Sequence, residues 1–154
     1  MLQTLRQRTS DEGGFTLIEL LVVILIIGIL AAIAIPAFLS QTSKASDSTA
    51  KTQAGTMQTT METYASENNG SFEGAKLAKL EEIEPTLSDH SQSTPQEVKN
   101  ATSTGYEVET IAAGTKNKFL IVDNAGKISH TCEVEKETVP GGCKLAAKST
   151  KGTW

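Results

Sequence analysis

Residues 20–39 carry no charge and no strongly polar group, and this apolar run constrains the fold more than any other feature. At about 1.5 Å per residue, twenty residues form a helix of roughly 30 Å, which matches the hydrocarbon thickness of a bilayer. A single carboxylate, Glu19, stands at the start of the run. Ionisable groups in membranes are costly, on the order of 3 kcal/mol at mid-depth, so Glu19 is interpreted first as a functional residue.

The remaining length and charge allow one modest domain. Removing residues 1–39 from the 154-residue chain leaves about 115 residues, enough for one hydrophobic core. The formal net charge is −4, and beyond residue 39 no two Lys or Arg residues are adjacent. The sequence therefore indicates no nucleic-acid partner.

Residues 1–14 are first basic, then acidic, and end in Gly13-Gly14 without apolar periodicity. This pattern predicts a processed leader. Two alternatives stay open: an uncleaved N-terminal anchor, and a conventional secretory signal cut after Ala32-Ile33-Ala34. The apolar run is at the length limit for a secretory signal, and a carboxylate at its leading edge is out of place there.

Cys132 and Cys143 lie eleven residues apart, with Pro140-Gly141-Gly142 between them. A metal site needs at least two further ligands, and only His130 is near. A disulfide is the favoured interpretation and free thiols are the alternative. In the chain-entropy model, closing this loop stabilises the fold by roughly 3 kcal/mol.

The direction of membrane insertion follows from the cysteines rather than from the charges. Arg6 and Arg8 precede the apolar run, and Lys44 and Lys51 follow it at similar distances, so positive-inside counting is nearly a tie. A disulfide forms in an extracytoplasmic compartment. We therefore expect a cytoplasmic N-terminus and an exported C-terminal part.

Two residues weaken the apolar helix. Gly28 stands four residues before Ala32, and this small-residue face allows close approach of another helix. Pro36 removes a backbone donor, which bends the helix or loosens its preceding turn.

Beyond Pro36 the helix is expected to continue in water. One apolar stripe recurs at helical spacing, with Lys51, Gln53, Gln58 and Glu62 outside it, and residues 68–70 supply a left-handed stop. The sequence thus predicts a single helix over about residues 16–69, half membrane span and half domain spine. The stripe consists of Ala50, Ala54, Met57, Met61 and Tyr64.

The C-terminal half is expected to form a small antiparallel sheet. Residues 70–104 are interpreted as a loop with a short helix around residues 77–83 that ends at Pro85. Alternating patterns then predict strands at residues 106–111, 118–123 and 127–133, with a turn at 124–126. The apolar segment 119–122 should be the central strand, covered by the helix stripe. The predicted class is α+β.

No catalytic constellation is found in the sequence. His90 and His130 lie in no recognisable nucleophile context, and no glycine-rich phosphate loop opens a helix. The cluster Glu81, Glu82 and Glu84 is typical of a solvated helix face. Asp123 with Asn124 lacks the ligand density that calcium requires. We expect no enzyme activity, no cofactor and no metal site.

Gly14, followed by Phe15-Thr16-Leu17-Ile18-Glu19 and the apolar run, resembles the class III signal of type IV pilins and of secretion pseudopilins. The resemblance extends from Gly13 to about Gln41. It includes Gly28 and Pro36, the latter at the family's helix-breaking proline. The rest resembles the family in architecture alone: a half-exposed helix, a variable loop, an antiparallel β-meander and a C-terminal disulfide loop.

The resemblance implies three parts: a leader (1–14), a transmembrane and filament-core helix (15–39), and a soluble head (40–154) with its sheet and disulfide loop at 105–154. It also implies cleavage after Gly14 by a membrane prepilin peptidase and N-methylation of Phe15. Glu19 would then pair with the free amine of Phe15 on a neighbouring subunit. Gly28 and Pro36 would loosen the helix inside the fibre.

The implied product is a homo-oligomeric helical filament built by a pilus assembly platform, from a single-pass inner-membrane precursor to an extracellular pilus. Within the family such filaments serve cell adhesion, motility or secretion. A major type IV pilin is favoured, because pseudopilins resemble this chain less at the Cys132–Cys143 end. A secretion pseudopilin, a minor pilin and, from another class, a monomeric membrane-anchored binding module are the alternatives.

Overall fold

A computed structural model describes residues 14–89, 93–135, 141–147 and 149–154 of the chain. The chain divides into two compact units, Met1–Ala37 and Phe38–Trp154, and the second is called the head below. Most of the predicted leader lies outside the described residues.

Helix α1 (Leu17–Glu67) runs through both units and confirms the predicted long helix to within two residues at each end. The predicted stop is also confirmed. Asn69 and Gly70 adopt left-handed conformations, with φ of 56° and 81°. The Gly70 N–H bonds to the Ala65 carbonyl at 2.7 Å, which satisfies a terminal carbonyl as in a Schellman-type helix end.

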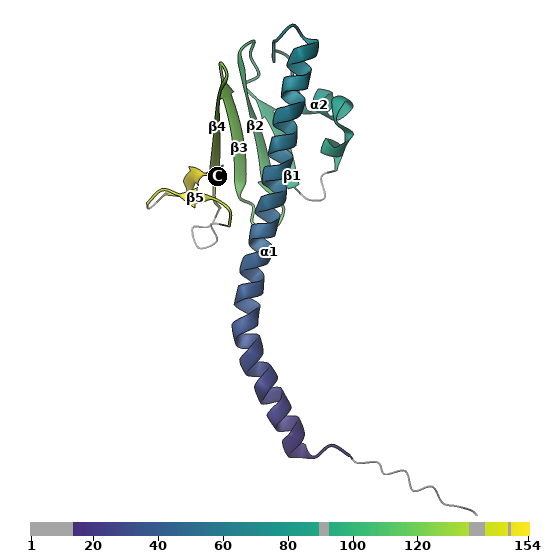
Figure 1. Ribbon diagram of the computed structural model, residues 1–154, viewed down its shortest axis with the longest axis vertical. Coiled ribbons are helices and arrows are strands. Elements are labelled where there is room, and N and C mark those ends of the chain that lie inside the picture. The colour runs from purple at the N-terminus through teal and green to yellow at the C-terminus, as the bar shows by residue number, and fades with distance from the viewer. Residues whose placement is uncertain (1–13, 90–92, 136–140, 148) are drawn as a thin grey trace, which may run out of the picture. The chain divides into compact units, whose positions relative to one another are not determined.

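The head contains one six-stranded antiparallel sheet in the order β1-β2-β3-β4-β6-β5 (Figure 1). The three predicted strands are present and β3 lies inside the sheet as expected. Ala125 and Gly126 have φ of 53° and 82°, the two positive values that a two-residue type I′ hairpin turn needs. The strands are β1 (Ser93–Lys99), β2 (Gly105–Ala112), β3 (Lys118–Asn124), β4 (Lys127–Glu133), β5 (Lys144–Leu145) and β6 (Lys151–Thr153).

The interpretation of residues 70–104 as mostly loop is wrong. The predicted short helix is present as α2 (Leu77–Ile83), but a 3₁₀ helix (Pro85–Ser88) and strand β1 follow it. Sequence patterns missed β1 because it contains Pro95 and few apolar residues. An edge strand tolerates a proline, and the register of β1 against β2 shifts between Ser93 and Gln96, where Pro95 falls.

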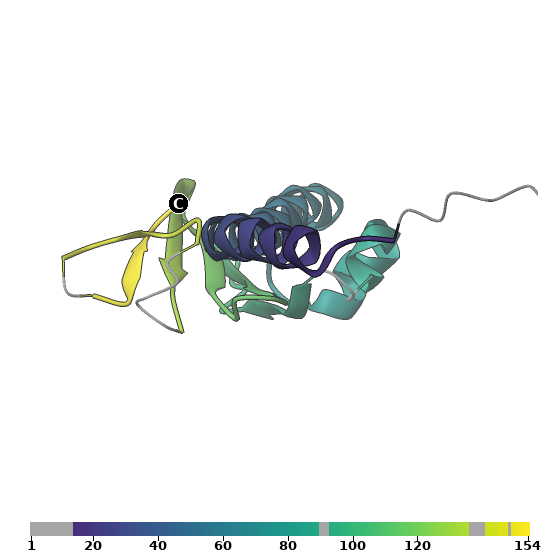
Figure 2. The ribbon, with the colours of Figure 1, turned by 90° about the horizontal axis from the view of Figure 1, so that it is seen from below.

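The core of the head forms between one face of the sheet and the second half of α1. Figure 2 shows α1 on that face. Four of the five predicted stripe residues have no exposed surface, and Tyr64 lies at the margin, half-buried. Two buried clusters result, one around Met57, Met61 and Ile121, the other around Ala50 and Phe119. The fully buried stripe residues are Ala50, Ala54, Met57 and Met61.

Tyr106 joins this core to the polar surface of α1. Its side chain is 2% exposed, it meets Phe72 edge-on, and its hydroxyl donates to Glu62 Oε1 at 3.0 Å. Burial, and secondly the negative charge of Glu62, raise the pKa of Tyr106 far above its ordinary value.

The folded state holds the Tyr106 proton more tightly than the unfolded state does. The contribution of Tyr106 to the stability of the head is therefore fully present below the pKa of an unfolded tyrosine, about 10, and is lost as the pH rises from there towards the folded-state pKa. We expect the free energy of unfolding to fall by about 1.4 kcal/mol per pH unit there on account of this group. Denaturant titrations of the chain in detergent micelles between pH 8 and 11 should show a shallower decline for Tyr106→Phe. Identical slopes in both proteins would contradict this account.

Candidate functional site

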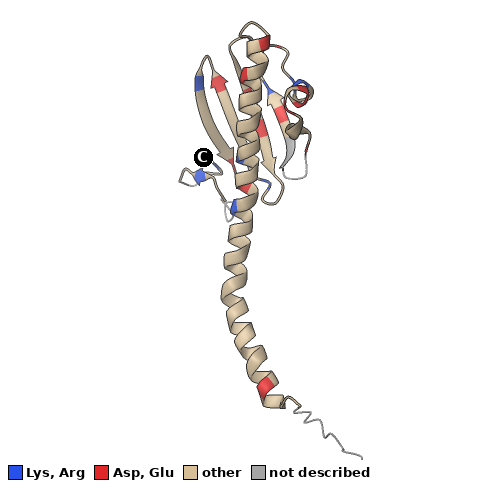
Figure 3. Ribbon diagram, turned by 45° about the vertical axis from the view of Figure 1, so that its right-hand side comes forward, with Lys and Arg blue, Asp and Glu red and all other residues tan. Residues whose placement is uncertain are grey.

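The first half of α1 exposes an unbroken apolar surface. Every large apolar side chain between Phe15 and Leu39 is at least 47% exposed. The helix is long and apolar enough to cross a membrane, judged by length and composition. In the described chain the charged residues are concentrated on the head (Figure 3). A surface of this size requires cover by lipid or by other proteins.

Gly28 opens a shallow apolar groove on this surface. A Cβ placed on Gly28 would meet nothing within 4 Å, so the notch is free in the single subunit. Pro36 lies inside the continuous helix α1, where it lacks the N–H that would bond to the Ala32 carbonyl. The groove is lined by Leu21, Ile24, Leu25, Gly28, Ile29 and Ala32.

Glu19 has a local role that the sequence reasoning missed. Its carboxylate accepts hydrogen bonds from the Thr16 backbone N–H at 2.8 Å and from the Thr16 hydroxyl at 2.7 Å. The Glu19 N–H donates back to Thr16 Oγ1 at 3.3 Å. This reciprocal arrangement is a capping box, and the Thr-x-x-Glu spacing of residues 16–19 was the signal for it.

The other predicted residues of this end lie close by in the chain. Gly14 and Phe15 are exposed and directly precede the capped first turn, and the Phe15 side chain is 87% exposed. Gly14, Phe15 and Glu19 are therefore accessible together at the start of α1.

The predicted disulfide is confirmed. Cys132 on β4 and Cys143 just before β5 are bonded, with their Cα atoms 5.8 Å apart. Both cysteines are buried and pack with Phe119 in the second core cluster. The bond ties the C-terminal part of the chain to the sheet.

Beside the disulfide lies a buried polar cluster that sequence reasoning did not find. Asp47 has no exposed surface, and its carboxylate accepts from Thr115 Oγ1, from Asn117 Nδ2 at 3.0 Å and from the Gly142 N–H at 2.8 Å. Extending the apolar stripe back by three residues from Ala50 leads to Asp47. A charge on the apolar face of a helix was the available signal.

The sequence interpretation placed Lys51, one helical turn after Asp47, outside the packed stripe. The structure corrects this, because the Lys51 side chain packs within the head. It is half-buried, and its Nζ donates to the Gly142 carbonyl at 2.6 Å. Nζ also lies 5.3 Å and 5.4 Å from the ring centroids of Phe119 and Trp154. Burial lowers the pKa of Lys51, and the negative charge of Asp47 opposes that shift.

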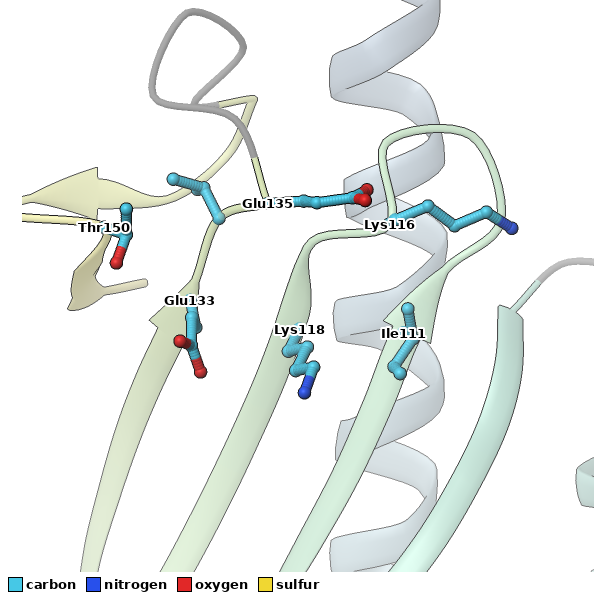
Figure 4. A pocket seen from close by; sticks show the side chains of 7 residues that line it. Ile111, Lys116, Lys118, Glu133, Glu135 and Thr150 are labelled. Atoms are coloured by element: carbon cyan, nitrogen blue, oxygen red, sulfur yellow. The ribbon is translucent and has the colours of Figure 1, made fainter.

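A further groove of about 720 Å³ lies at the edge of the sheet where β2 and β4 end and β3 begins. Lys118 and Glu133 face each other across β3 and β4, and Figure 4 shows their side chains on the side of the strands away from α1. The groove contains no histidine or cysteine, and the described residues hold no cluster of three potential metal ligands. It is lined by Ile111, Lys116, Lys118, Glu133, Val134, Glu135 and Thr150.

Known proteins are similar to this chain both in its N-terminal motif and over most of its length. Residues 9–35 match the family model described as the prokaryotic N-terminal methylation motif. A fimbrial protein of Moraxella nonliquefaciens is 32% identical over 152 residues, which covers 88% of this chain and 98% of that protein. The fimbrial protein EcpC of Eikenella corrodens is 30% identical over 150 residues, or 90% of this chain and 95% of that protein.

Other relatives match over a shorter stretch. The type IV major pilin protein PilA of Myxococcus xanthus is 48% identical over 56 residues, covering 36% of this chain and 26% of that protein. The comparison with solved structures gives no significant match.

An apolar N-terminal helix that carries the methylation motif and continues into an α+β head defines a class of membrane-anchored filament proteins. The similarity to fimbrial proteins along almost the whole chain narrows this class. The chain belongs to the type IV pilin family, and it is a structural pilin subunit.

Proposed function

We propose that the chain is the major subunit of a type IV pilus, made as a single-pass precursor in the inner membrane with its N-terminus in the cytoplasm. The observation that carries this proposal is the exposed apolar surface from Phe15 to Leu39, headed by one carboxylate and attached to a folded polar head. Lipid covers this surface in the precursor, and neighbouring helices cover it in the filament.

Processing supplies the partner that Glu19 needs inside the filament. A prepilin peptidase cuts after Gly14, Phe15 becomes the N-methylated N-terminus, and its amine pairs with Glu19 of a neighbouring subunit. A carboxylate surrounded by apolar helices requires such a partner, because an unpaired buried charge costs several kcal/mol. In the isolated subunit, Thr16 satisfies the same carboxylate.

Features of the head favour a pilus subunit over a secretion pseudopilin. The Cys132–Cys143 bond closes a loop near the C-terminus, as the resemblance to pilins implies. The relatives that match over most of this chain are named fimbrial proteins. Several relatives that match over only about a third of this chain are named major pilins or major fimbrial proteins. Such a subunit is structural and not an enzyme, and the assembly platform is its partner before polymerisation.

Mass spectrometry of sheared surface material tests processing and assembly together. We expect a chain that begins at methylated Phe15 and is two hydrogens lighter than the reduced form, because Cys132 and Cys143 are bonded. The membrane fraction of a peptidase-deficient strain is the control and should contain the chain with its leader. A sheared chain that still carries residues 1–14, or absence of the chain from sheared filaments, would contradict the proposal.

Glu19→Ala should be processed normally and assemble poorly. Removing one partner of a desolvated charge pair costs about 3–5 kcal/mol, so we expect at least a tenfold loss of surface filaments in shearing assays. Glu67→Ala, which removes an exposed acid at the other end of α1, is the matched control and should assemble normally.

Thr16→Ala separates the two roles of Glu19, because it removes the hydroxyl of the capping box and leaves the Phe15 amine in place. We expect a milder defect than that of Glu19→Ala. Equal losses of filaments in Thr16→Ala and Glu19→Ala would mean that Glu19 acts only as a helix cap. Normal filaments from Glu19→Ala would show that Glu19 has no role in assembly.

Gly28 and Pro36 are proposed to let the helix loosen when subunits pack in the fibre. Gly28→Ala combined with Pro36→Ala should leave the single subunit folded, since the Gly28 notch is open. We expect filaments with an altered axial rise and lower extensibility, measured by electron microscopy and force spectroscopy. Unchanged rise and stretch would show that the helix does not loosen at these positions.

A further inference from the structure

The segment of residues 141–143 is bound to α1 by two side chains that lie one helical turn apart. Asp47 Oδ2 accepts from the Gly142 N–H at 2.8 Å, and Lys51 Nζ donates to the Gly142 carbonyl at 2.6 Å. Both backbone polar groups of Gly142 are thus satisfied by opposite charges from the same helix. We call the pair Asp47 and Lys51 the clasp.

The clasp is supported from behind. Thr115 and Asn117, in the connection between β2 and β3, donate to the remaining acceptor positions of the Asp47 carboxylate. Lys51 lies over the rings of Phe119 and Trp154, and Trp154 is held by a 3.0 Å hydrogen bond from its indole N–H to the Thr131 carbonyl. The two charged groups are therefore held by contacts other than those with residues 141–143.

The two glycines allow the backbone to approach the clasp closely, since a side chain at either position would displace Asp47 or Lys51 from its present place. A Cβ on Gly141 would collide with Asp47 Oδ2, and Gly141 has a φ of 53°. A Cβ on Gly142 would lie 2.7 Å from Lys51 Nζ. The Gly141-Gly142 pair, which the sequence offers as an ordinary turn, is thus required by the close approach of the backbone to the clasp.

The clasp and the disulfide act on different states of the chain. A disulfide stabilises chiefly by restricting the unfolded chain. The clasp consists of charge-assisted hydrogen bonds that exist only in the folded head, and none of them involves a cysteine. Hydrogen bonds to charged groups are roughly twice as strong as neutral ones.

We propose that the clasp of Asp47 and Lys51 is a second, redox-independent attachment that keeps residues 141–143 docked on α1 when the Cys132–Cys143 bond is reduced. Asp47 and Lys51 are positioning residues in this scheme. The position of residues 141–143 on α1 then does not depend on the oxidation state of the two cysteines. This inference concerns the single subunit and stands apart from the proposed filament role.

Hydrogen exchange of the Gly142 amide tests the clasp directly. The full ¹⁵N-labelled chain in detergent micelles is compared with and without a phosphine reductant, and thiol alkylation confirms complete reduction. We expect the Gly142 amide to stay protected in the reduced wild type. Amides of β2 and β3 report whether the head remains folded. Exchange of Gly142 at the rate of an unstructured chain, with these strands still protected, would overturn the proposal.

Variants assign the protection to the clasp. In reduced Asp47→Ala, loss of the charged acceptor should speed Gly142 exchange by about tenfold or more. Lys51→Met keeps the aliphatic stem and should give a smaller increase. Ser48→Ala, an exposed neighbour, is the control and should match the wild type.

Asp47→Asn distinguishes positioning from general destabilisation. Its amide oxygen can still accept from Gly142 and its NH₂ group can donate to Thr115, so protection should be partly restored relative to Asp47→Ala. If Asp47→Ala does not fold, Asp47→Asn and Lys51→Met decide the question by themselves. Wild-type exchange of reduced Gly142 in every clasp variant would overturn the proposal.

Discussion

The head depends on the packing of α1 against the sheet. The contact uses small and flexible side chains, Ala50 and Ala54 for close approach and Met57 and Met61 for filling irregular space. Fully burying each methionine contributes about 1.5–3 kcal/mol relative to leaving it exposed. Phe72, Leu80 and Leu87, from the segment between α1 and β1, complete the same core. The same helix also carries most of the exposed apolar surface of residues 15–39, so one element provides both the core contact of the head and the surface proposed for assembly.

Periodic patterns made much of this architecture predictable. The long helix, its stop at Asn69 and Gly70, and strands β2–β4 follow from spacings of 3.6 and 2.0 residues and from turn residues with positive φ. The disulfide followed from two cysteines without further metal ligands. These features depend on local sequence, which is why they could be read without the structure.

Features that depend on distant contacts could not be predicted in the same way. Strand β1 has too few apolar residues to show alternation, and β5 and β6 are too short to have a period. Asp47 interacts with residues 68 to 95 positions away in the chain, so its role is visible only in the folded head. At the N-terminus the Thr16-x-x-Glu19 spacing itself predicts a capping box, so the role of Glu19 as a helix cap was predictable from sequence even though only its assembly role was inferred.

The two edges of the sheet bear on how heads can lie beside one another. Edge strand β1 contains Pro95, which lacks an N–H, and its register is irregular at that point. At the opposite edge, β5 offers two residues. Strands of this kind are poor templates for adding a strand from another molecule. Crowded heads are thus discouraged from merging their sheets into a continuous, amyloid-like ladder.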